Sequence, residues 1–309
     1  MAMPDRSSQD CAGSHGLTVT CGDNGSMFSS PAERCVAPTG PINSTGGEAA
    51  DVLALPTRPL LTRRKRPVWR DFCRHGIPEY LAHYYWWAYL WKPGIRFFDH
   101  PLIINLVLFG QYRKLTERAL ACLEKRPIGR FLQLACVYGS LTSEIARRLD
   151  FEGLSIADVS ADQLGVTRLK LAIDRGPDSL PVDFMRCNGE SLAYRDQSFD
   201  TALLFFLLHE LPPRARAAVL AETARVLSRG GRLVIVDYGS RAPSHLLHRL
   251  GPLRRIHERL EPFLKGFRQA DLIADIEQAA AQAGTRVVDV DETPVFGGFY
   301  RVVEVRFGI

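Results

Sequence analysis

Two apolar segments of the chain end in side chains that could do chemistry. The first, residues 154–157, is followed by Asp158, nineteen positions after Gly139 in the preceding turn. In a strand–turn–helix–strand unit, an acid about 20 residues beyond the turn is the group that holds the hydroxyls of a ribose. Asp158 is therefore a candidate ligand-binding residue, and a helix N-cap is its structural alternative.

The second segment, 201–208, ends in His209 and Glu210. Its continuous apolar pattern predicts a strand buried on both faces, and open α/β sheets bind ligands at the carboxyl ends of their strands. A neutral imidazole there could accept a proton or bind a metal, whereas a packed, hydrogen-bonded histidine is the structural alternative. Asp237 and Tyr238 end the next predicted strand and could reach the same cleft. No spacing of His, Asp or Glu identifies a metal site by itself.

The turn after the first predicted strand departs from the usual pattern of an acid followed by three alternating glycines. Gln133 stands in place of the acid, Ala135 and Val137 in place of two glycines, and only Gly139 is kept. Glycines let the backbone approach a ligand at positive φ, which a β-branched residue resists. Tyr138 adds a phenol where a small residue is usual. Either a ligand lies differently here or the site is inactive.

These positions give a catalytic set and a cofactor-binding set. Tyr138 and Ser140 are predicted to face the reacting end of a cofactor, with drift in a degenerate turn as the alternative. The amide of Asn188 could accept a hydrogen bond from an adenine amino group, with a plain loop residue as the alternative. The predicted catalytic residues are Tyr138, Ser140 and His209, and the predicted cofactor-binding residues are Gln133, Ala135, Val137, Gly139, Asp158, Asn188 and Gly189.

Alternating strand and helix patterns must position these residues. From residue 128 onward they predict a mainly parallel sheet, that is, a doubly wound, Rossmann-type α/β fold. The expected strands are 131–134, 154–157, 182–185, 201–208 and 233–236, with a hairpin of 286–290 and 299–307 at the sheet edge, and the expected helices start at Leu141, cover 161–173, run from Pro212 to a stop at Gly230-Gly231, and cover 271–283.

Composition divides the chain into three parts. Residues 1–62 are rich in Ser, Gly, Pro and Thr, which predicts a disordered tail. We expect a helical aromatic cap at 63–127 and the α/β domain at 128–309, with an insert at 241–268. The hydrophobic content of 46% fits a soluble globular protein, and neither a signal-peptide core nor a transmembrane run is present. Seven cysteines without a Cys-x-x-Cys pair indicate reduced thiols.

Three segments could contact a membrane surface. Residues 63–66 are all basic, residues 84–91 include six aromatic side chains, and the insert 241–268 carries seven Lys or Arg against two Glu. Basic clusters and basic amphipathic helices bind anionic lipid, and Tyr and Trp favour membrane interfaces or apolar pockets. The structural alternatives are a solvated linker, a helical layer on the core and a lid over the site. We expect no nucleic-acid partner.

Further motifs carry a family resemblance. They are Asp158-Val159-Ser160, Glu190-Ser191-Leu192 before residues 196–200, and the segment 225–233 around a Gly-Gly pair. In this order and spacing they make residues 128–309 similar to a class I S-adenosylmethionine (SAM)-dependent methyltransferase. The turn 135–142, together with Tyr85-Trp86-Trp87-Ala88-Tyr89 upstream, resembles the rhodoquinone biosynthesis family RquA over about residues 70–309.

The second resemblance implies an enzyme that converts ubiquinone to rhodoquinone by replacing a ring methoxy group with an amino group. It implies SAM as the nitrogen donor and a divalent metal, Mn²⁺. We accordingly expect ubiquinone as the small-molecule substrate and a cytoplasmic protein, peripheral on the inner face of the membrane. The alternatives are methyl transfer from SAM to a quinone or another apolar ring, and a catalytically silent scaffold that binds a quinone.

Overall fold

A seven-stranded sheet organises the part of the chain that the structure describes. The structure is a computed structural model, and it describes residues 69–174, 182–240, 255 and 259–308. All of these lie in one compact unit, Leu61–Ile309. The predicted tail 1–62, the basic cluster 63–66, and residues 241–254 and 256–258 of the insert 241–268 fall outside the described residues.

The sheet confirms the predicted doubly wound α/β fold. Its strand order is β3-β2-β1-β4-β5-β7-β6, with β1 to β5 parallel and β7 antiparallel to both of its neighbours. The parallel strands are near-continuous apolar runs because helices cover both faces of the sheet. The strands are β1 (Arg130–Leu134), β2 (Gly153–Asp158), β3 (Val182–Arg186), β4 (Phe199–Phe205), β5 (Leu227–Tyr238), β6 (Arg286–Val295) and β7 (Tyr300–Gly308).

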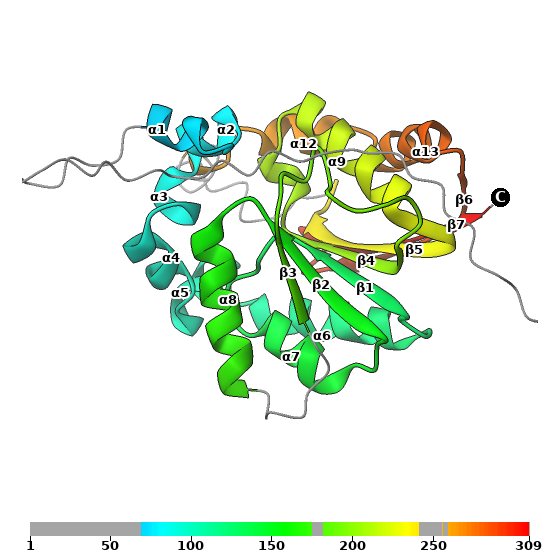
Figure 1. The fold of residues 1–309 in the computed structure, drawn as a ribbon, viewed down its shortest axis with the longest axis horizontal. Coiled ribbons are helices and arrows are strands. Elements are labelled where there is room, and N and C mark those ends of the chain that lie inside the picture. Colours follow the sequence, from blue (N-terminus) through cyan, green and yellow to red (C-terminus); the bar gives the residue numbers. More distant parts are fainter. Residues whose placement is uncertain (1–68, 175–181, 241–254, 256–258, 309) are drawn as a thin grey trace, which may run out of the picture. The chain divides into compact units, whose positions relative to one another are not determined.

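Helices form a layer on each side of this sheet (Figure 1). On one side, α8 contacts β2 and β3, α7 contacts α8, and α6 contacts β5 and β7. On the other side, α9 contacts β5 and α13 contacts both α9 and β6. The helices of the two layers are α6 (Tyr112–Glu124), α7 (Leu141–Arg148) and α8 (Ala161–Asp174), and α9 (Pro213–Val226), α12 (Leu264–Gln269) and α13 (Leu272–Gln282).

The prediction that the fourth strand runs to Leu208 was wrong. β4 ends at Phe205, because Phe206 takes a left-handed φ of 54°. The next residues form the short 3₁₀ helix η1 (Leu208–Glu210). The Asp237 carboxylate accepts hydrogen bonds from the N–H groups of Leu208 and His209, at 3.1 and 3.3 Å. The two candidate residues therefore lie in a turn above the strand end, held there by the end of β5.

The prediction that Gly230-Gly231 ends a helix was also wrong. Helix α9 ends at Val226, and Leu227 already has extended backbone. Strand β5 runs through both glycines. Gly230 has a φ of +85°, which favours glycine, and the β4–β5 register shifts here, between Phe199 and Thr201. The glycines therefore serve a bulge in a long strand.

Five short helices precede α6 and form what we call the cap, residues 69–107. The predicted aromatic segment lies in α2 and α3, which meet at Tyr85. Within the described ranges, no helix combines the length and apolar character needed to cross a bilayer. The cap helices are α1 (Trp69–Arg74), α2 (Glu79–Tyr84), α3 (Trp86–Tyr89), α4 (Lys92–Phe98) and α5 (Pro101–Val107).

Candidate functional site

The carboxyl ends of the parallel strands line a pocket, which we call the strand-end pocket. It is lined by residues 134–136 at the end of β1, 157–159 at the end of β2, 187–189 after β3 and 205–207 at the end of β4, and by Tyr80 and Tyr89 of the cap. This is the place where doubly wound sheets bind their ligands. Among the predicted residues, the pocket brings together Ala135, Asp158, Asn188 and Gly189.

Among the residues that the structure describes, Asp158 is one of two acidic side chains that line this pocket, the other being Glu210. The Asp158 carboxylate accepts hydrogen bonds from the backbone N–H groups of Cys136 and Ser160, both at 2.7 Å. Burial raises the pKa of Asp158 to about 6, although these two hydrogen bonds oppose the rise. The ionised form keeps lone pairs for further donors, such as the two hydroxyls of a ribose.

Some of the other predicted cofactor-binding residues line the strand-end pocket, and others do not. Asn188 lies in the pocket, where its Oδ1 accepts from the N–H of Glu190 at 3.0 Å. Ala135, also in the pocket, takes the left-handed φ of 72° that a glycine usually supplies. Gln133 is fully buried inside β1 and donates to the carbonyl of Ala135 at 3.1 Å. Gln133 therefore supports the turn from behind and does not line the pocket.

The backbone N–H groups at the start of α7 are already hydrogen-bonded to side chains of this protein. The N–H of Gly139 donates to Asp99, and Lys170 binds the same carboxylate oxygen at 2.7 Å. The Tyr112 hydroxyl accepts from the N–H groups of Ser140 and Leu141, at 2.7 and 2.9 Å. A Cβ on Gly139 would lie 2.5 Å from that hydroxyl. The group that packs closely against Gly139 is therefore the Tyr112 side chain. Close contact between Gly139 and a ligand stays a prediction.

We expect Tyr112→Phe to lower the free energy of unfolding by about 1–3 kcal/mol, because two backbone donors at the start of α7 lose their acceptor. Urea unfolding at equilibrium measures this change. Tyr84→Phe is the matched control, since the Tyr84 side chain is 44% exposed and should tolerate loss of its hydroxyl. Equal stability of Tyr112→Phe and the parent would show that Tyr112 does not fasten the turn.

A second, aromatic pocket lies beside the strand-end pocket. Its volume is about 280 Å³, and it is lined by Tyr85, Trp87, Ala88 and Tyr89 of the cap, by Val137 and Tyr138 of the turn, by Tyr238, and by Leu260 and Glu261. The rings of Tyr89 and Tyr138 stack with centroids 5.6 Å apart and an interplanar angle of 8°. Such a pocket suits a flat apolar ring. The aromatic segment therefore packs on the domain and lines a pocket.

The predicted catalytic residues Tyr138 and Ser140 have different surroundings. Tyr138 presents its ring to the aromatic pocket, while its hydroxyl donates to the carbonyl of Ala88 and accepts from Gln163. Burial raises the pKa of Tyr138 far above its usual range. Ser140 is exposed and lines neither pocket. The geometry favours a ring-positioning role for Tyr138, and a catalytic role for either residue stays a prediction.

His209 lies at the base of the aromatic pocket and is almost fully buried. Its Nδ1 is 2.8 Å from Asp237 Oδ1, a close ion-pair contact that lies off the line of a straight hydrogen bond. Burial alone lowers the pKa of His209, but the carboxylates of Asp237 and Glu261 outweigh it and raise that pKa to about 9. The Nε2 atom remains directed toward two further carboxylates.

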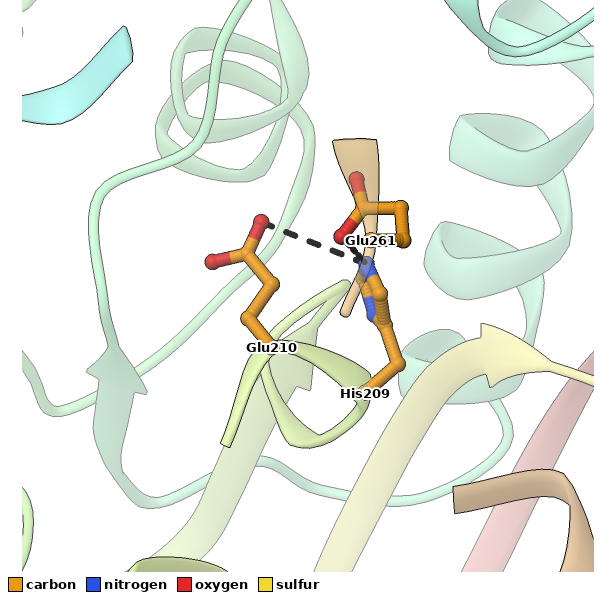
Figure 2. Close-up of side chains that lie close together, drawn as sticks. All are labelled: His209, Glu210 and Glu261. Atoms are coloured by element: carbon orange, nitrogen blue, oxygen red, sulfur yellow. Dashed lines mark ion pairs between the residues drawn. The ribbon is translucent and has the colours of Figure 1, made fainter. Parts of the chain in front are cut away.

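Those carboxylates belong to Glu210 and Glu261, as Figure 2 shows. His209 Nε2 lies 4.0 Å from Glu210 and 3.7 Å from Glu261. Burial raises the pKa of Glu210 to about 8, against the lowering effect of His209, and burial also raises the pKa of Glu261. Tyr89 donates a hydrogen bond to Glu210 and Tyr85 donates one to Glu261. The three side chains form a buried, protonatable cluster, which we call the His–Glu–Glu cluster.

Sequence reasoning missed Glu261, Tyr112 and Asp99. Glu261 comes from the insert, 176 positions after its partner Tyr85, and the described part of the insert, 259–268, packs inward through the buried Leu264 and Phe267. The lid alternative stays a prediction, and the predicted basic amphipathic helix lies mostly outside the described residues. No local pattern marks these long-range partners, although the two acids of the otherwise basic insert, Glu258 and Glu261, were a usable signal for Glu261.

Residues 131–231 match the family model described as "Methyltransferase domain". This segment contains β1 from its second residue, the whole of β2, β3 and β4, the start of β5, helices α7 to α9 and most of the strand-end pocket. With the strand order above, the match confirms the predicted class I SAM-methyltransferase-like fold.

Curated relatives match the same region. The chain is 30% identical over 141 residues to the ubiquinone/menaquinone biosynthesis C-methyltransferase UbiE of Stenotrophomonas maltophilia, a match that covers 45% of this chain and 54% of that one. The corresponding protein of Xylella fastidiosa is 29% identical over 142 residues, with 46% and 54% covered. The chain thus spans about half the length of the curated relatives it matches. These relatives do not bear on rhodoquinone, so that family resemblance remains a prediction.

Among solved structures, magnesium protoporphyrin IX methyltransferase from Synechocystis PCC 6803 with bound SAH is 15% identical. The match covers 67% of this chain and 87% of that chain, with a TM-score of 0.46. This likeness is too distant to support an argument about function.

Proposed function

We propose that this protein uses SAM to modify a quinone ring, by the amination that turns ubiquinone into rhodoquinone. The observation that carries the proposal is the wall shared by the two pockets. Tyr89, Cys136, Phe206 and Glu210 line both of them. A cofactor in the strand-end pocket and a flat ring in the aromatic pocket would therefore meet at a titratable carboxyl group. Amination itself rests on the family resemblance.

The residues present fit SAM. Asp158 offers its carboxylate to the ribose hydroxyls, and Asn188 lies where its amide can meet the adenine. The N–H groups at the start of α7 are bonded to Asp99 and Tyr112, so they do not hold the amino-acid end of SAM. We expect that end to turn toward the shared wall, beside Cys136.

The reaction needs a proton acceptor and a held ring. The amine nitrogen bonds to the ring carbon, the carbon–oxygen bond to the methoxy group breaks, and methanol leaves with the proton that the nitrogen gives up. The bond between that nitrogen and the α-carbon of SAM would break in a later step: the quinone ring takes up the two electrons of the Cα–H bond, and water hydrolyses the resulting imine to an aminoquinol and a 2-oxo acid. Glu210 lines the shared wall and would receive the proton on the carboxylate oxygen that does not bind the divalent metal ion implied by the resemblance. Tyr89 and Tyr138 stack against one another and would fix the plane of the ring.

The His–Glu–Glu cluster fits the divalent metal that the resemblance implies. The ligand atoms of His209, Glu210 and Glu261 lie within 4.8 Å of one another. Each has a partner behind it, namely Asp237, Tyr89 and Tyr85, which is how proteins orient metal ligands. The two carboxylates are ligands that suit Mn²⁺, and the imidazole is a common ligand of transition metals. When bound, such an ion would polarise a quinone carbonyl.

We expect Glu261→Gln to weaken Mn²⁺ binding at least about tenfold, since even an outer partner of a metal ligand is worth about 10- to 100-fold in affinity. Electron paramagnetic resonance of free Mn²⁺ during a titration measures the affinity without any turnover. Glu292→Gln, on the edge strand β6, is the matched control. If Glu261→Gln and the parent bind Mn²⁺ equally, the cluster is not the metal site.

The proposed function is tested by incubating the protein with SAM, Mn²⁺ and a short-tailed ubiquinone. Mass spectrometry should find a quinone in which an amino group has replaced a methoxy group.

Methyl transfer is the second candidate, favoured by the methyltransferase-domain match and by the C-methyltransferase relatives. It would give a quinone heavier by one methyl group, on a precursor ring with a free position. If neither the short-tailed ubiquinone nor the precursor quinone is changed, the result would favour the scaffold alternative. A cytoplasmic location at the inner face of the membrane remains part of the proposal.

A further inference from the structure

Helix α5, Pro101–Val107, carries an apolar surface that neither pocket explains. Its sequence is Pro-Leu-Ile-Ile-Asn-Leu-Val, yet none of its residues is buried. Leu102 and Leu106 are each 73% exposed, and their spacing of four puts them on one face of the helix. Apolar residues gathered in this way on a surface mark a site of interaction with a protein or a membrane.

The apolar surface extends onto the preceding helix, α4. Phe97 at its end is 55% exposed, and Trp91 immediately before it is 45% exposed. Tryptophan is enriched at the boundary between lipid and water. An exposed face of Leu, Phe and Trp therefore has the composition of an interfacial element.

The charges around this surface are mostly positive. Lys92 and Arg96 on α4, and Arg113 and Lys114 at the start of α6, are all exposed, and Lys92 pairs with Asp162 at 3.3 Å. The acid between residues 91 and 116 is Asp99, whose carboxylate is already bound by Lys170 and the N–H of Gly139. Basic side chains beside an apolar face complement an anionic lipid surface.

The same helix also forms part of the aromatic pocket. Ile104 and Val107 line that pocket, as does Leu260 from the insert. Val107 is 45% exposed and Leu260 is 47% exposed, so both belong to the pocket and to the outer surface. The pocket thus reaches the surface beside the exposed leucines.

We propose that α5 and Phe97 insert into the headgroup region of an anionic bilayer, and that the apolar tail of the substrate enters the aromatic pocket from the lipid between Val107 and Leu260. The route of the tail rests on the proposed function, whereas the docking of α5 does not. This surface differs from the three segments that the sequence indicated, 63–66, 84–91 and 241–268.

The test compares two double variants in the full chain. Leu102→Glu/Leu106→Glu places acids on the α5 surface, and Val288→Glu/Val290→Glu makes the same kind of change on β6, where both valines are exposed and which Figure 1 places far from α5. Sedimentation with vesicles of phosphatidylglycerol and phosphatidylcholine measures the partition. We expect the α5 variant to bind about 100-fold more weakly than the parent, as for the loss of two buried leucines, and the β6 variant to bind like the parent.

Turnover separates docking from chemistry. The α5 variant should modify a short-tailed, water-soluble quinone as fast as the parent does, but should lose most turnover of a long-tailed quinone held in vesicles. Equal vesicle binding by parent and α5 variant would overturn the proposal. The proposal would also be overturned if analytical ultracentrifugation showed that the parent forms a dimer, that this dimer does not bind vesicles, and that the α5 variant is a monomer. If the parent modifies neither quinone, the proposed function fails, while the vesicle result still decides the docking.

Discussion

Glu210→Gln is expected to lower turnover of the quinone by about 100-fold or more, the scale of one positioned proton-transfer group. Glu210 is buried, lines both pockets and accepts a hydrogen bond from Tyr89. Glutamine keeps the shape of the side chain but cannot take up the proton released by an attacking amine. The measurement is the single-turnover rate at saturating SAM, followed by the appearance of modified quinone.

SAM affinity should stay within about threefold of the parent in this variant, because the adenosine end of the strand-end pocket is unchanged. Glu117→Gln on α6 is the matched control, since its side chain is 54% exposed and pairs with Arg148. A Glu210→Gln enzyme with the parent's single-turnover rate would remove Glu210 from the chemistry. A variant that has lost SAM binding would instead make Glu210 part of the cofactor site.

Asp158→Ala is expected to weaken SAM binding by roughly 10- to 150-fold. This corresponds to about 1.5–3 kcal/mol, the contribution of a hydrogen bond to a charged group. Calorimetric titration with SAM measures the loss. Asp162→Ala is the matched control, because Asp162 lies four positions further on and pairs with Lys92 outside the pocket. Equal affinity of Asp158→Ala and the parent would exclude Asp158 from the ribose site.

The pH dependence of SAM binding gives a second view of the same residue. Burial raises the pKa of Asp158 from 3.8 to about 6, so the side chain is ionised above that pH and neutral below it. Only the ionised form accepts hydrogen bonds at both oxygens. SAM affinity in the parent should therefore fall as the pH drops through about 6, and in Asp158→Asn it should change little over that range.

The parallel sheet could be predicted from the sequence because its strands are buried on both faces. The apolar runs 131–134, 154–157 and 201–208 are distinct even without a structure, although the last of them continues past the end of β4 at Phe205. Since parallel strands end at one edge of the sheet, the polar residues after them were expected to gather there. Asp158 and Asn188 do so in one pocket, and His209 meets Asp237 for the same reason.

The cap side of the site could not be predicted, because its contacts join distant parts of the chain. Asp99 reaches Gly139 across 40 positions, and Tyr85 reaches Glu261 across 176. Neither pair has a periodicity or motif. The sequence pointed to Val137 as the strained residue of the turn, whereas the positive φ values lie at Ala135 and Gly139. Backbone direction in an irregular turn depends on partners such as Tyr112, which only the fold reveals.

The proposed amination requires SAM to donate its α-amino nitrogen to the ring. The most direct measurement incubates the protein with a short-tailed ubiquinone, Mn²⁺ and SAM labelled with nitrogen-15 at its α-amino group, and analyses the quinone by mass spectrometry. We expect an aminoquinone that carries the heavy nitrogen, formed at a much lower rate by Val137→Gly/Tyr138→Gly, which alters the aromatic pocket but retains Asp158. An aminoquinone without the label would contradict SAM as the nitrogen donor, and a quinone that has gained a methyl group would contradict amination.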